Sequence, residues 1–210
     1  MPRTNTKQEP GWPAMLAILV VGIIYAALPN YLSVGPRWLL ILLVSLLEIP
    51  TVLAARRQWI RANRTLGFVT SVLITLFLLW SLALLILALP AHKENPVDLL
   101  RSAVTLWLGN VIIFAFWFWR LDAGGSYGRD PFPRHPAGAF LFPQMIAPEK
   151  FPGWSPRFVD YLFIAFNNAT AFSPTDSPVF ARWAKVLTML QSLISLTIVI
   201  LLAARAVDIL

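Results

Sequence analysis

Six apolar segments of 16 to 32 residues constrain the fold of this chain more than any other feature. The fifth is barely long enough to span a bilayer core, and the last is longer than the bilayer requires. A helix needs about 20 apolar residues to cross that core. Only 13% of the 210 residues are charged, against about 25% in a soluble domain, so water does not solvate most of the surface. Because lipid offers the backbone no hydrogen bonds, such segments must be helical. The sequence predicts an all-α membrane protein with six hydrophobic helical segments, over residues 12–32, 38–55, 66–89, 99–119, 158–173 and 179–210.

Four arginines with no acidic residue between them follow the second segment: Arg56, Arg57, Arg61 and Arg64. An excess of Lys and Arg marks the cytoplasmic side of a membrane, so this connection and the amino terminus are predicted to be cytoplasmic. Six crossings then place the carboxyl terminus in the cytoplasm as well. The net charge of +7 lies mostly at helix ends, which favours contact with anionic lipid headgroups and argues against a nucleic-acid partner.

The chain divides into three predicted regions. Residues 1–122 form a four-helix transmembrane region, 123–156 a Pro- and Gly-rich cytoplasmic or interfacial connection, and 157–210 a hairpin followed by a long final helix. The fourth segment ends in an aromatic run, 114–119, which is predicted to be a belt at the membrane interface. The apolar stretch 140–146 is too short to cross and is predicted to lie in the interface.

Residue types needed for catalysis are scarce. Cysteine is absent, and the two histidines, His92 and His135, lie in connecting segments. The chain therefore offers no thiol, no histidine-rich metal set and no nucleophile–base pair. The stretch 124–128 is rich in glycine, but no Lys-Ser/Thr follows it and no strand precedes it, so it is not a phosphate loop. We expect no enzyme activity, no cofactor and no metal site.

Glu48 lies deep in the second segment, two residues before Pro50. A charged side chain at mid-membrane costs about 2.5 to 3.5 kcal/mol on insertion scales, so Glu48 should face protein or water. Pro50 frees a helix carbonyl nearby, and a carboxylate beside that carbonyl could bind a cation or carry a proton. The alternative is a protonated or paired acid that stabilises helix packing. The sequence favours neither.

The last region concentrates polar side chains between a short apolar helix and a long one. They belong to Asn167, Asn168, Thr170, Ser173 and Asp176. The adjacent amides lie on two faces of one helix, so at least one must meet another helix or water. The other mid-membrane polar or small residues are predicted to make interhelical contacts; these are Gly109, Asn110, Gln191, Ser192 and Ser195.

Residues 158–210 resemble the pore module of tetrameric cation channels: a short aromatic helix, a turn that bears Thr170 and ends in Asp176, and a long inner helix. The turn takes the place of the selectivity filter, but it is a degenerate filter without glycine. Since carbonyl rings need glycine, polar side chains would line the path instead. The resemblance implies a homo-oligomer that passes monovalent cations.

Most of the chain is also similar to uncharacterised bacterial polytopic integral-membrane proteins. The similarity rests on the four amino-terminal spans, the Arg-rich loop, the Phe-Pro-Gly segment at 151–153 and the Asp-Tyr-Leu-Phe segment at 160–163. It implies a multi-pass protein of the bacterial inner membrane and names no reaction.

Two functions fit these features. The first is a channel-like or transport-related protein for cations, with the polar residues of the last region along the path and Glu48 as an ion or proton site. The alternative is a non-catalytic membrane scaffold or accessory subunit without a pore, in which the same polar groups join helices.

Overall fold

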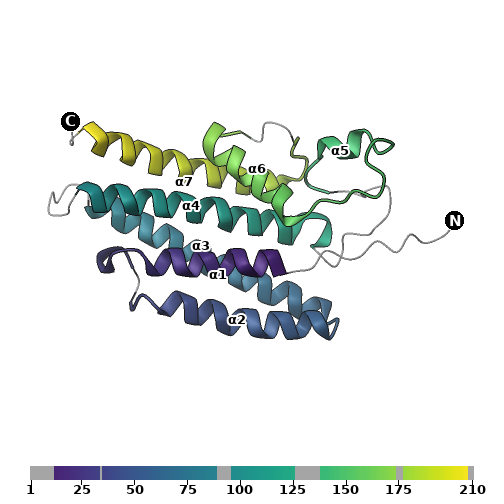
Figure 1. The fold of residues 1–210 in the computed structure, drawn as a ribbon, viewed down its shortest axis with the longest axis horizontal. Helices are drawn as coiled ribbons and strands as arrows, with labels where there is room; N and C mark the ends of the chain where they lie inside the picture. The colour runs from purple at the N-terminus through teal and green to yellow at the C-terminus, as the bar shows by residue number, and fades with distance from the viewer. Residues whose placement is uncertain (1–11, 34, 89–95, 126–137, 174–176, 208–210) are drawn as a thin grey trace.

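Helix α4 (Pro96–Leu121) is the central helix, and the other long helices surround it (Figure 1). The computed structural model describes residues 12–33, 35–88, 96–125, 138–173 and 177–207. The helices that contact α4 are α1 (Trp12–Ala26), α3 (Ile60–Ala88), α6 (Phe158–Ala171) and α7 (Arg182–Val207). Helix α2 (Leu39–Arg56) packs on α1 and α3, and the short α5 (Pro143–Ile146) lies in the connection before α6.

The part of the chain that the structure describes is helical, and its only β pairing is an isolated antiparallel bridge between Phe140 and Val179. Helices α2, α3, α4 and α7 are long and apolar enough to cross a membrane, and α1 is a shorter apolar helix. These findings confirm the predicted all-α class and fit a chain that spans a membrane.

The outward faces of α2 and α7 are apolar. Leu46 and Ile49 on α2, and Leu193 and Ile200 on α7, are each more than half exposed. A large exposed apolar surface is unusual for a monomer in water, but lipid tails are as apolar as these side chains. The helices are therefore built to be solvated by lipid on one face and by the other helices on the opposite face.

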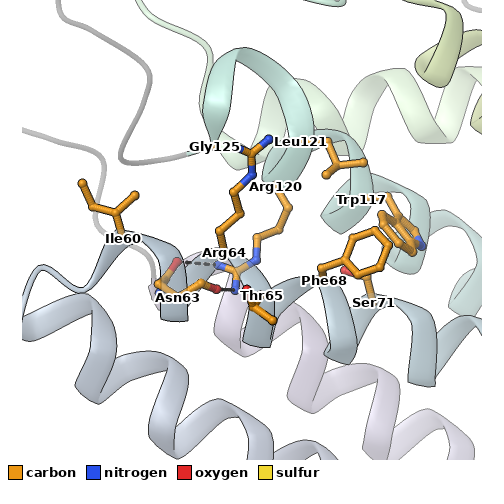
Figure 2. Close-up of a pocket in the computed structure, with 10 residues that line it drawn as sticks. All are labelled: Ile60, Asn63, Arg64, Thr65, Phe68, Ser71, Trp117, Arg120, Leu121 and Gly125. Atoms are coloured by element: carbon orange, nitrogen blue, oxygen red, sulfur yellow. Dashed lines mark hydrogen bonds between the residues drawn. The ribbon is translucent and has the colours of Figure 1, made fainter.

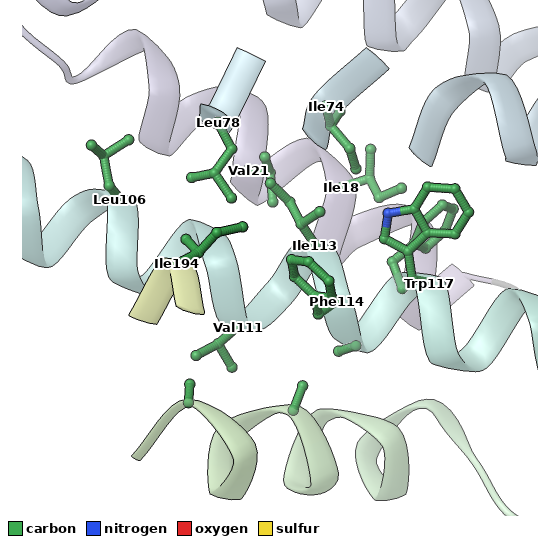
Figure 3. Close-up of a cluster of buried hydrophobic side chains, with 14 of the residues drawn as sticks. Ile18, Val21, Ile74, Leu78, Leu106, Val111, Ile113, Phe114, Trp117 and Ile194 are labelled. Atoms are coloured by element: carbon green, nitrogen blue, oxygen red, sulfur yellow. The ribbon is translucent and has the colours of Figure 1, made fainter. Parts of the chain in front are cut away.

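The core lies around α4, where residues of α1, α3, α6 and α7 pack against it (Figure 3). Lipid tails supply no hydrophobic driving force between helices, so close packing must hold this core together. The labelled side chains of the cluster are Ile18, Val21, Ile74, Leu78, Leu106, Val111, Ile113, Phe114, Trp117 and Ile194.

The aromatic run 114–119 belongs to this core, so the predicted interfacial belt is wrong. Phe114 and Phe118 are fully buried, and the indole N–H of Trp117 donates to Thr75 Oγ1 at 2.9 Å. The carboxyl-terminal half of α4 is covered by other helices. Its rings therefore meet protein where contact with lipid headgroups was expected.

Helices α6 and α7 run in the same direction. Gln191 donates to the carbonyl of Ala165, and Ser195 donates to the carbonyl of Ala169, so both pairs are 26 residues apart. A constant offset between paired residues means that the two helices are parallel. The chain must therefore turn back between them.

The return segment pairs with residues that follow α4. Phe180 donates its backbone N–H to Ala139 at 2.8 Å, and Leu141 donates to Pro178 at 3.1 Å. Near the start of α6, Tyr161 bonds to Asp122 at the end of α4. The α6 hairpin thus starts and returns at one end of the bundle, and its 14 residues span only about 21 Å, less than a bilayer core of about 30 Å.

Five helices, α1 to α4 and α7, alternate in direction along the bundle. As a result the start of α1 and the end of α7 lie at opposite ends (Figure 1). The sequence predicted both termini on one side because it counted residues 158–173 as a full crossing. That arrangement does not match a hairpin that turns back.

Candidate functional site

Asn168 is the member of the predicted polar path that the structure places deepest in the protein. Its side chain is buried and donates to Gln191 Oε1 at 2.8 Å and to the carbonyl of Thr188 at 3.0 Å. It also accepts a hydrogen bond from Ser192 Oγ at 3.1 Å. All three partners lie on α7, so this amide joins α6 to α7.

The same contacts extend to the central helix. Trp107 on α4 donates its indole N–H to Ser195 Oγ at 2.9 Å, and Asn110 donates to the carbonyl of Gln191 at 3.3 Å. The predicted interhelical role of Asn110, Gln191, Ser192 and Ser195 is confirmed by these bonds and those above. We call the set the amide network; it consists of Trp107, Asn110, Asn168, Gln191, Ser192 and Ser195.

The other predicted path residues are not gathered around Asn168. Asn167 is partly exposed, Thr170 is exposed with its hydroxyl donating to the carbonyl of Phe166 at 2.9 Å, and Ser173 is exposed near the tip of the hairpin. Asp176 lies outside the described residues. Within one chain, the structure therefore brings Asn168 together with partners on α4 and α7 instead of with its sequence neighbours.

Glu48 on α2 is buried against protein, as the sequence predicted. Its Oε1 has no hydrogen-bond partner among the described residues. The positive charge that acts on it electrostatically is Arg120, the residue that directly follows the aromatic run 114–119 of α4.

Arg120 lies across α3 at the position of Gly67. Its guanidinium donates to the carbonyl of Asn63 at 3.0 Å and to Asn63 Oδ1 at 3.3 Å, and its Cζ lies 5.4 Å from the ring centre of Phe116. A β-carbon on Gly67 would overlap the guanidinium. The only sequence signal for this contact is a lone glycine inside a helix, which often marks a close approach of another group.

Asn63 connects this arginine to a third helix. Its amide is buried and donates to the carbonyl of Thr51 on α2 at 3.0 Å. Thr51 follows Pro50, whose missing N–H interrupts the hydrogen bonding of that helix. Residues of α2, α3 and α4 thus meet around one partly buried cation, which the sequence did not predict.

A pocket of about 360 Å³ opens beside Arg120, between α3 and α4 (Figure 2). Polar side chains of Asn63, Arg64 and Thr65 line one part, and Phe68, Trp117 and Leu121 line another. Figure 2 shows the Arg64 side chain extending from α3 toward the end of α4. The pocket is therefore cationic on one side and apolar on the other.

A second buried acid lies at the same end of the bundle. Asp122 is fully buried; its Oδ2 accepts from the Tyr161 hydroxyl at 2.6 Å and its Oδ1 accepts from the backbone N–H of Ala139. These bonds attach the connection and the start of α6 to the end of α4. The sequence gives no sign of this role, because Asp122 stands beside a Gly-rich stretch and its partners lie 17 and 39 residues further along the chain.

Among the described residues, no group of three His, Asp or Glu side chains could hold a metal ion. Comparison with protein-family models, with curated proteins and with solved structures found no match for the chain.

Proposed function

We propose that this chain is a non-catalytic membrane scaffold or accessory subunit, the alternative that the sequence left open. The observation that carries the proposal is the amide network. Asn168 and Gln191 bond to each other, and their amide N–H groups donate to the carbonyls of Thr188 and Ala165, so these two side chains join α6 to α7. Polar residues at mid-membrane that bond across helices in this way stabilise helix packing.

The proposed topology follows from the arginine cluster and the hairpin. Arg56 to Arg64 would lie in the cytoplasm, α6 would enter and leave the membrane from that side, and five helices would cross. The start of α1 is then cytoplasmic and the end of α7 is on the far side of a bacterial plasma membrane. This differs from six crossings in the path of the chain after α6 and in the location of the carboxyl terminus.

Reporter fusions distinguish the two topologies. A reporter joined after Arg64 should be cytoplasmic in both, whereas one joined after Leu210 should be periplasmic if α6 turns back. Paired phosphatase and fluorescent reporters measure the location directly. A cytoplasmic reporter after Leu210 would contradict the five-crossing topology and restore the six-segment one.

Replacing Asn168 with leucine tests the scaffold itself. We expect the free energy of unfolding to fall by about 1.5 kcal/mol, the upper range for an interhelical hydrogen bond in a membrane, because Gln191 and Ser192 lose their partner. The matched control is Thr170→Val, which removes an exposed hydroxyl bonded only within its own helix and should change stability little. Unfolding by SDS in mixed micelles measures both variants.

Cation flux into proteoliposomes decides whether the network serves a pore. The scaffold proposal expects the wild-type protein to pass no more monovalent cation than protein-free vesicles. Two results together would contradict the scaffold proposal. The wild-type protein would conduct cations, and Asn168→Leu or Asp176→Ala would reduce that current without changing the free energy of unfolding.

One observation favours a second function, cation- or proton-coupled transport. The buried Glu48 carboxylate has an oxygen without a hydrogen-bond partner in the described part of the chain, and intramembrane acids are costly and commonly functional. In that case Glu48→Gln should abolish flux in the same vesicles without affecting insertion. If Glu48→Leu instead raises thermal stability and flux is absent throughout, the acid belongs to the packing.

A further inference from the structure

The pocket between α3 and α4 has the composition of an anion site. Two cations line it, Arg64 from α3 and Arg120 from α4 (Figure 2), and none of its lining residues in the described part of the chain is acidic. Arg64 is exposed and has no hydrogen-bond or ion-pair partner among the described residues. Its guanidinium is therefore available to a ligand.

The second cation is held in place by the protein. Arg120 rests on Gly67 and donates twice to Asn63, so its charge is fixed at the base of the pocket before any ligand arrives. A planar guanidinium matches the oxygens of a phosphate in geometry as well as charge. Thr65 adds a hydroxyl to the same wall, and a hydroxyl donates readily to such oxygens.

The remaining walls indicate what the anion is attached to. Phe68 packs edge-on against Trp117, with ring centres 5.4 Å apart, and Ile60 and Leu121 line the pocket beside them. Phe68 and Ile60 are more than half exposed. A free inorganic phosphate would gain nothing from these apolar surfaces, whereas the acyl chains of a lipid would cover them.

The location of the pocket agrees with this chemistry. It lies at the end of the bundle where Arg56, Arg57 and Arg61 also gather at the start of α3 and the end of α2. In the topology proposed above this end is cytoplasmic. Basic pockets between transmembrane helices on the cytoplasmic side bind the headgroups of anionic phospholipids. We propose that Arg64 and Arg120 bind the phosphate of an anionic phospholipid headgroup, with its acyl chains against Phe68 and Ile60.

Removing the charge of Arg64 is the test, and Arg61 supplies the matched control. Arg61 lies three residues before Arg64 on α3 and is also exposed, but it does not line the pocket. The full-length protein in an uncharged detergent is titrated with short-chain phosphatidylglycerol, short-chain phosphatidylcholine or inorganic phosphate, and the rise of the unfolding temperature gives each apparent affinity. Arg64→Ala should weaken phosphatidylglycerol binding about tenfold, the loss of one charge-assisted contact, whereas Arg61→Ala should change it less than about twofold.

A third variant tests the apolar wall. Phe68→Ala should weaken phosphatidylglycerol binding and leave the weak response to inorganic phosphate unchanged. Each variant must unfold at the wild-type temperature without ligand; if Arg64→Ala does not, Arg64→Gln takes its place.

Three results would overturn the proposal. Equal affinities for phosphatidylglycerol and phosphatidylcholine would show that the net negative charge of the headgroup plays no part in binding. Equal losses of phosphatidylglycerol affinity in Arg64→Ala and Arg61→Ala would show that the lipid binds the basic surface as a whole and not the pocket. Binding of inorganic phosphate as tight as that of phosphatidylglycerol, with the same dependence on Arg64, would assign the site to a free phosphate.

Discussion

Replacing Gly67 with alanine is expected to lower the free energy of unfolding by about 2 kcal/mol, although alanine is the better helix former by about 1 kcal/mol. The added methyl group would occupy the volume of the Arg120 guanidinium, so the guanidinium must shift from its place on α3. It then loses two charge-assisted hydrogen bonds to Asn63, worth about 1.5 to 3 kcal/mol each. Unfolding by SDS in mixed micelles gives the free energy directly.

Two further variants isolate the cause. In an Arg120→Ala background there is no guanidinium to displace, so Gly67→Ala should become neutral or stabilising. Gly109→Ala is the control inside the neighbouring helix, since its β-carbon would meet only Leu78 Cδ1 at 4.0 Å, and it should also be neutral or stabilising. If Gly67→Ala lowers the free energy of unfolding equally with and without Arg120, the glycine is not needed to make room for the guanidinium.

Asp122→Leu is expected to cost about 3 kcal/mol. Two buried donors, the Tyr161 hydroxyl and the Ala139 backbone N–H, lose their acceptor, and each unsatisfied donor costs about 1 to 3 kcal/mol. Because these bonds attach the start of α6 to the end of α4, we expect the hairpin to loosen first. Hydrogen exchange of α6 amides, compared with those of α3, measures that local opening.

A double-mutant cycle identifies the pair responsible. If the cost arises from the orphaned hydroxyl, Asp122→Leu combined with Tyr161→Phe should be less destabilising than the sum of the single changes. Asp98→Ala, an exposed acid at the other end of the same helix, should stay within about 0.5 kcal/mol of the wild type. Additive costs for Asp122→Leu and Tyr161→Phe would contradict the coupling.

The sequence predicted that Asn168 or its neighbour makes a polar contact, but not which group it contacts. Adjacent amides in a short apolar helix predict that one of them meets another helix or water, and both outcomes suit the same residues. Only the parallel packing of α6 on α7 brings Gln191 to Asn168. A pair 23 residues apart leaves no local pattern that distinguishes a polar path from a packed contact.

The sequence by itself determined that this chain is helical and apolar enough to cross a membrane. Both properties are local, because helix hydrogen bonds join residues four apart and the length of an apolar run can be counted directly. It also predicted that Glu48 faces protein or water and not lipid, because the cost of exposing an acid to lipid is a property of the residue and its depth; the structure places it against protein.

Only the tertiary structure decided which groups meet. The turn-back of α6 and the contacts of Arg120 with Gly67 and of Tyr161 with Asp122 depend on residues 26 or more positions apart. The burial of the aromatic run of α4 depends on how many helices surround it. Apolar periodicity is nearly uninformative here, since a side chain facing lipid and one facing another helix are equally apolar. Which helix faces meet is decided by the fit of their side chains and by the need of buried polar groups for hydrogen-bond partners. Neither can be read from the order of the residues along the chain.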